Sequence, residues 1–144
     1  MGSKNEHSTV NRQDLQTLAK KWMSFWQGAP LEKFNDVHSS TFVDYGAGNR
    51  GATRDDFRNS VVALYDAFPD FHATTEDIII DEVNQTVVIR WTATGAHKKA
   101  FMGQSPTDKT IAFEGIEIIK CNDAKVIERW GGWDGIQILE QIRS

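Results

Sequence analysis

The chain has 144 residues, 40% of them hydrophobic and 25% charged, with a formal net charge of −4. This length suits one domain with a real core, and the charge balance gives no basic surface for nucleic acid. No apolar run approaches the length that spans a membrane, so we expect neither a nucleic-acid nor a membrane partner. The single cysteine, Cys121, excludes an internal disulfide framework and favours a reducing, cytoplasmic setting.

The polar opening, residues 1–10, lacks the apolar core of a signal peptide, and we expect a disordered tail there. Residues 11–144 then form a single domain. An amphipathic helix is predicted over residues 11–27, with Asn11 as its N-cap and Gly28 at its end. Its apolar face has helical spacing and comprises Leu15, Leu18, Ala19, Trp22, Met23 and Trp26.

Further elements follow in chain order. Residues 31–37 predict a short helix, residues 41–45 a short strand and residues 46–51 a turn. Thr53 and Asp56 have the spacing of a capping box, which predicts a third helix that stops before Pro69. Strands are then expected over residues 71–82, 86–97, 109–121 and 125–133, followed by a helix over residues 134–143.

Helices followed by a run of antiparallel strands indicate an α+β fold. We expect a curved antiparallel sheet that wraps around the N-terminal helices to form a cone with an internal pocket. An apolar cone of this kind is suited to binding a small molecule.

The last two predicted strands place acidic groups among aromatic ones. Alternation along both strands and a turn at residues 123–124 pair Cys121 with Val126 and Glu117 with Trp130. One face of the hairpin is then expected to carry Phe113, Glu117, Glu128 and Trp130. The other is expected to carry Ile116, Ile118, Ile127 and Arg129.

Four residues are candidates for proton chemistry. Buried among aromatic rings, Glu117 would be a general base or an acid of raised pKa; otherwise it is a solvated strand carboxylate paired with Lys or Arg. Glu128 shares its predicted face, or forms a salt bridge near a dimer edge. Asp134 is either catalytic or the N-cap of the last helix, since Gln137 lies three residues on. His97 is either a donor or base at the pocket mouth or the anchor of a loop.

Nine large side chains are candidates for lining the pocket and binding substrate, with plain core packing as the alternative: Trp22, Trp26, Tyr45, Phe68, Trp91, Met102, Phe113, Trp130 and Trp133. No set of His, Cys, Asp or Glu has convincing metal-ligand spacing, so no metal site is expected.

Eight segments between about Leu15 and the C-terminus have the order and spacing of a known family: residues 67–71, 88–97, 101–103, 105–109, 113–119, 126–130, Asp134 and 139–141. This organisation resembles the nuclear-transport-factor-like, or cystatin-like, α+β superfamily. More narrowly it resembles the SnoaL-like polyketide cyclase family, with its ester cyclase-like members.

The resemblance implies cofactor-free acid–base chemistry. Characterised cyclases of this family close a polyketide ring by an intramolecular aldol reaction, with an acid expected just after the last-strand tryptophan and a histidine across the hairpin. Here Gly131 follows Trp130 and the facing position holds Glu117, so that pair is absent as such and Glu117 is the substitute acid. The related ketosteroid isomerases also place an acid near Glu117, and their early-strand base is here missing or moved to Asp44.

Three functions remain open on this sequence. The first is a small enzyme that cyclises, isomerises or hydrolyses an apolar carbonyl compound. The second is a non-catalytic module that binds a small molecule, and the third is a dimeric structural or interaction protein with an incidental cavity.

We also expect a homodimer through the outer sheet face, because exposing the side chains of Ile116, Ile118 and Ile127 to water would be unfavourable. A lid over the pocket is expected to be formed by residues 101–109.

Overall fold

The computed structural model of the chain describes residues 9–48 and 51–144. Of the tail expected over residues 1–10, residues 1–8 lie outside the described residues, as do residues 49–50 of the predicted turn. Val10 is already fixed to the domain. Its backbone N–H donates to Oε1 of Gln85 at 2.9 Å, and Nε2 of Gln85 donates to its carbonyl at 3.0 Å.

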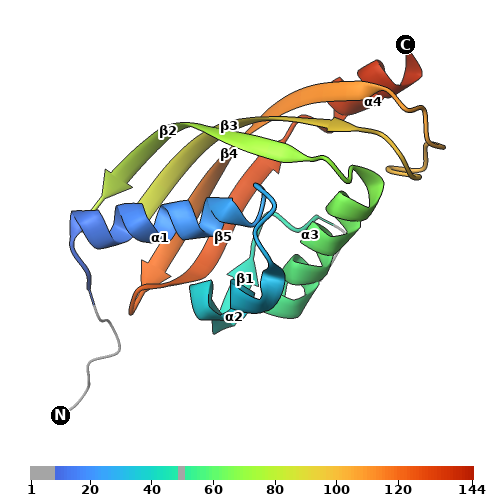
Figure 1. Cartoon of the computed structure of the whole chain (residues 1–144). Coiled ribbons are helices and arrows are strands. Elements are labelled where there is room, and N and C mark those ends of the chain that lie inside the picture. Colours follow the sequence, from blue (N-terminus) through green and yellow to red (C-terminus); the bar gives the residue numbers. More distant parts are fainter. Residues whose placement is uncertain (1–8, 49–50) are drawn as a thin grey trace.

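Helices and strands follow the predicted order closely. The helices are α1 (Arg12–Ser24), α2 (Phe34–Val37), α3 (Arg54–Ala67) and α4 (Gly135–Arg143), with a 3-10 turn η1 (Leu31–Lys33) before α2. The strands are β1 (His38–Asp44), β2 (His72–Asp81), β3 (Thr86–Ala96), β4 (Thr110–Asn122) and β5 (Lys125–Trp133). Figure 1 shows α1 lying across the curved sheet, with α2 and α3 beside β1 and α4 near the far ends of the strands.

The α+β class is confirmed, with one correction to the sheet. The strand order is β1-β5-β4-β3-β2, and β1 runs parallel to β5, so the sheet is mixed and not wholly antiparallel. The other three pairings are antiparallel. No hairpin links β1 to β5, because α3 and three strands lie between them in the chain. The sequence therefore did not determine whether this edge strand runs parallel or antiparallel to its neighbour.

Local signals set the helix starts as predicted. Oδ1 of Asn11 accepts the N–H of Asp14 at 2.8 Å, and Thr53 forms a full capping box with Asp56. Asp134 caps α4 by accepting the N–H of Gln137 at 3.1 Å. Each cap satisfies an N–H group that the first turn of a helix would leave without a partner.

The register of the β4–β5 hairpin differs from the predicted one. Cys121 pairs with Val126 as expected, but Lys120 pairs with Glu128, which leaves Ile127 as an extra residue on β5. Beyond this bulge every β5 side chain changes face. Glu117 therefore lies opposite Gly131, and its own inward direction, shared with Phe113, is as predicted.

The faces predicted for three β5 residues are accordingly wrong. Arg129 points inward and is buried. Glu128 pairs with Lys120 and Trp130 pairs with Ile118, so the side chains of Glu128 and Trp130 lie on the outer face.

Apolar side chains form a row across the outer face of the sheet. Cross-strand pairing connects Ile79 to Val88, Val88 to Ile118 and Ile118 to Trp130. Ile79 is 63% exposed, Ile118 39% and Trp130 40%, and the ring of Tyr45 stacks on Trp130 with centroids 4.8 Å apart. An apolar row of this extent is unfavourable in water.

We propose that two copies pair through this row. Ile118→Asp puts a charge at its centre, so sedimentation at micromolar concentration should change from a dimer to a 16.3 kDa monomer. Val83→Asp is the control, because Val83 is exposed away from the row and its replacement should leave the dimer intact. A wild-type protein that sediments only as a monomer would contradict the proposal.

An aromatic cluster around a buried histidine closes the core between α2 and β1. His38 is fully buried, its ring stacks on Phe34 at 3.9 Å, and Nδ1 lies 2.9 Å from the carbonyl of Phe34. Burial is the main cause that lowers the pKa of His38 from 6.5 to about 4. The imidazole is therefore neutral in the folded protein at neutral pH, with Nδ1–H donating to that carbonyl.

This histidine should make the protein acid-sensitive. Between pH 6.5 and about 4, His38 binds a proton in the unfolded chain but not in the folded chain. The free energy of unfolding should therefore fall as the pH falls, by about 3 kcal/mol in total. Urea unfolding across this range should show that part of the pH dependence disappearing in His38→Asn. The exposed His72, replaced in the same way, is the control. Equal pH dependence of wild type and His38→Asn would refute the assignment.

Candidate functional site

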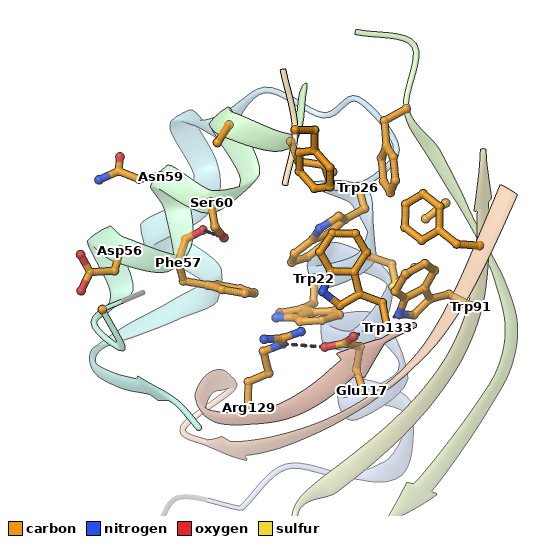
Figure 2. A pocket seen from close by; sticks show the side chains of 18 residues that line it. Trp22, Trp26, Asp56, Phe57, Asn59, Ser60, Trp91, Glu117, Arg129 and Trp133 are labelled. Carbon is orange, nitrogen blue, oxygen red and sulfur yellow. Dashed lines mark hydrogen bonds and ion pairs between the residues drawn. The ribbon is translucent and has the colours of Figure 1, made fainter. Parts of the chain in front are cut away.

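A cavity of about 460 Å³ lies between α1, α3 and the inner face of the sheet. This volume is in the range of small-molecule sites. Figure 2 shows Glu117 and Arg129 together at its base, aromatic side chains beside them, and Asp56, Asn59 and Ser60 on the opposite, α3 side. Its remaining lining residues are Trp22, Met23, Trp26, Gly51, Phe57, Ala63, Leu64, Phe71, Ala73, Trp91, Phe101, Phe113 and Trp133.

Aromatic rings line the cavity on both its helical side and its sheet side. On the helical side Trp22 and Trp26 have ring centroids 4.4 Å apart, and Trp26 lies 5.5 Å from Phe57. On the sheet side Phe113 lies 5.8 Å from Trp91 and 5.3 Å from Trp133. A planar apolar molecule would find contacts on both sides.

Two carboxylates and one guanidinium form a buried chain at the base of the cavity. Nε of Arg129 donates to Oε1 of Glu117 at 2.6 Å, and Nη1 of Arg129 donates to Oδ1 of Asp44 at 2.9 Å. The indole Nε1 of Trp91 donates to Oε2 of Glu117 at 3.1 Å. The Glu117 side chain is 3% exposed, that of Arg129 9% and that of Asp44 0%, so water screens these charges little.

Burial and charge act in opposite directions on Glu117. Burial raises the pKa of its carboxyl above the ordinary value, whereas the charge and hydrogen bond of Arg129 and the hydrogen bond of Trp91 lower it. The negative charge of Asp44 works with burial, and the pKa remains raised overall. Burial lowers the pKa of Arg129, but the charges and hydrogen bonds of Glu117 and Asp44 raise it, and the pKa is raised overall. Arg129 therefore remains a cation. Glu117 is thus an acid of raised pKa that lines a cavity.

Two glycines make room for this arrangement. A Cβ at Gly131, directly across the hairpin, would overlap Oε1 of Glu117 and approach Nη2 of Arg129 within 2.8 Å. A Cβ at Gly115 would overlap the six-membered ring of Trp91, its partner on β3. Both positions must therefore lack a side chain for Arg129 and Trp91 to reach Glu117.

The predicted pocket residues divide into two groups. Trp22, Trp26, Trp91, Phe113 and Trp133 line the cavity. The remaining four do not. Tyr45 and Trp130 stack on each other at the outer face, Met102 is exposed, and Phe68 is fully buried against His97 and Phe101.

The other three acid–base candidates lie away from the cavity wall. Glu128 is on the outer face, and Asp134 is committed to capping α4. His97 is buried and does not line the cavity; its Nδ1 lies 3.1 Å from Oγ1 of Thr107, which matches the loop-anchoring alternative. The expected lid segment reaches the cavity through Phe101.

Apart from Glu117, sequence reasoning did not place the polar residues of this site in the cavity. Arg129 was assigned to the wrong face because no residue type in this segment predicts the bulge at Ile127. Asp56, Asn59 and Ser60 recur at helical spacing on α3, a signal that could have marked them as one face. Asp56 is also part of the capping box, and Asn59 is exposed.

Other reactive groups in the described part of the chain are less suited to chemistry. Cys121 is buried, and burial raises the pKa of its thiol to about 12, so it is no nucleophile at neutral pH. Across residues 9–48 and 51–144, no group of three or more His, Cys, Asp or Glu side chains could hold a metal ion. None of the described helices is long and apolar enough to cross a membrane.

A comparison with protein families supplies an independent finding. The model of a family described as SnoaL-like polyketide cyclase matches residues 16–142. No curated protein matches the chain significantly.

Solved structures share the fold across nearly the whole chain. AclR from Streptomyces galilaeus is 23% identical, with a TM-score of 0.82, and the match covers 92% of this chain and 98% of AclR. TsrD from Streptomyces laurentii is 14% identical, with a TM-score of 0.83 and coverage of 92% and 97%. A SnoaL-like polyketide cyclase from Agrobacterium tumefaciens is 15% identical, with a TM-score of 0.74 and coverage of 89% and 97%.

The close approach at Gly131 gives a direct test of the site geometry. Gly131→Ala should displace Glu117 from Arg129 and lower the free energy of unfolding by about 1–3 kcal/mol, as overpacking of a core does. Gly132→Ala is the matched control, because a Cβ there meets no atom within 4 Å. Chemical denaturation of the two variants measures the difference. Equal stability of both would mean that Glu117 does not occupy the space opposite Gly131.

Proposed function

Because this chain belongs to the SnoaL-like polyketide cyclase family, we propose that it is an enzyme that binds an apolar carbonyl compound in the cavity and performs acid–base chemistry on it without a cofactor. The observation that carries the proposal is the buried carboxyl of Glu117 on the wall of an aromatic cavity. Its raised pKa brings proton transfer closer to neutral pH.

Glu117 would begin the reaction by removing a proton from a carbon next to the ligand carbonyl. The negative charge then moves to the carbonyl oxygen and needs a hydrogen-bond donor. Trp22 is a candidate for this role, because it lines the cavity and its buried Nε1 has no hydrogen-bond partner among the described residues. Arg129, also on the wall, keeps a positive charge close to the reacting groups.

The same first step serves several outcomes. An enolate can attack a second carbonyl to close a ring, or take the proton back at another carbon to complete an isomerisation. With water in place of the carbon acid, Glu117 would act as base for hydrolysis. The buried, unreactive Cys121 is compatible with the reducing, cytoplasmic setting that we propose for this chemistry.

Proton exchange offers a test that needs no knowledge of the natural substrate. Apolar ketones and 1,3-diketones in deuterated water should exchange their α-protons in the presence of the protein, as followed by proton NMR. Glu117→Gln should lower the exchange rate on the order of 100-fold while the ligands still quench the fluorescence of the cavity tryptophans. Fold should be retained, because Arg129 keeps Asp44 as its partner.

The matched control is Glu114→Gln. Glu114 lies on the same strand but is exposed, so its replacement removes one charge without touching the cavity. Its exchange rate should equal that of the wild type. Equal rates for wild type and Glu117→Gln, with ligand binding intact, would reject Glu117 as the base. If both rates also equal the rate without protein, a non-catalytic binding module is favoured.

A further inference from the structure

One cation is shared between two carboxylates below the cavity. Arg129 gives one N–H group to Glu117, through Nε, and another to Asp44, through Nη1. Neither carboxylate receives a two-bond fork in these contacts, although that geometry is the strongest that arginine offers. Asp44 is itself fully buried and is fixed by the N–H of Gly46 at 2.9 Å.

We propose that Asp44 is a positioning residue that holds Arg129 between two carboxylates and thereby keeps Glu117 able to take up a proton. This inference rests on the proposed function, in which Glu117 transfers the proton. Asp44 does not line the cavity, so it would act only through Arg129.

The charge balance explains why Asp44 matters. With Asp44 ionised, the chain of three groups carries one positive and two negative charges. Removal of the Asp44 charge would leave Glu117 and Arg129 as a balanced pair, and a carboxylate in such a pair holds its negative charge firmly and is a poor base. In a buried site this difference is large, because water screens little.

The described neighbours of Glu117 come from three strands, and one further carboxylate, Asp56, lies on the cavity wall. From β5 it faces Arg129, from β1 Asp44 through Arg129, and from β3 the indole of Trp91. The α1 residues on the cavity wall do not ionise. Asp56 of α3 lies on the same wall, where its carboxylate accepts hydrogen bonds from the N–H and the hydroxyl of Thr53 within the capping box.

The indole of Trp91 provides a reporter. Its N–H donates to Oε2 of Glu117, so its proton NMR resonance should shift when Glu117 takes up a proton. Trp91→Phe identifies the resonance, and Glu117→Gln should abolish its pH transition. In Asp44→Asn, which keeps the size and an acceptor oxygen, the midpoint should move to lower pH.

The matched control is Asp77→Asn. Asp77 forms an exposed ion pair with Arg90 at 2.7 Å, and the control should leave the Trp91 midpoint where it is in the wild type. An Asp44→Asn midpoint that stays in place or moves to higher pH would overturn the proposal. A midpoint that moves equally in Asp77→Asn would do the same, since the effect would then be one of net charge.

A second variant keeps the test decisive if Asp44→Asn does not fold. Asp44→Ser also removes the charge and keeps an oxygen acceptor, so its Trp91 midpoint should likewise move to lower pH, and a midpoint that stays in place would overturn the proposal. Both titrations use ligand-free protein and involve no turnover. Failure of Glu117 as a catalytic base and failure of Asp44 as its positioning residue therefore give separate results.

Discussion

The ion pair between Arg129 and Glu117 connects three strands below the cavity. Glu117 comes from β4, Arg129 from β5, and Asp44 at the end of β1 holds the other side of the guanidinium. Charges buried in this way are unfavourable unless each has partners with good geometry, and here the hydrogen bonds of Trp91 and Gly46 supply further ones. The pair is buried, and this burial makes Glu117 chemically distinct from the exposed carboxylates of the sheet.

A second constraint is the backbone that lets these groups meet. The extra residue Ile127 turns Arg129 into the cavity and Trp130 out of it. Gly131 then leaves the space that the Glu117 carboxylate fills. The same bulge therefore determines two surfaces: the charged groups at the bottom of the cavity and the apolar row on the outer face of the sheet.

Much of this structure could be predicted from sequence because the signals were local. Helix caps at Asn11, Thr53 and Asp134 follow from residues three positions apart. Strict alternation along β4 fixes the inward direction of Glu117 and Phe113. The parallel pairing of β1 with β5 depends on contacts between distant segments.

The bulge at Ile127 also left no local mark, because a valine or isoleucine there suits a regular strand equally well. Hence Glu117 was identified and Asp44 was named only as a possible base, whereas the contacts of Arg129 with both carboxylates were not predicted. A crystal structure with a molecule that stays bound in a native mass spectrum tests the central claim most directly. The account predicts a carbonyl compound between Trp26 and Phe113, with the carbon next to its carbonyl about 3–3.5 Å from the Glu117 carboxylate. A ligand held at the α3 side, with Glu117 out of reach behind Arg129, would contradict it.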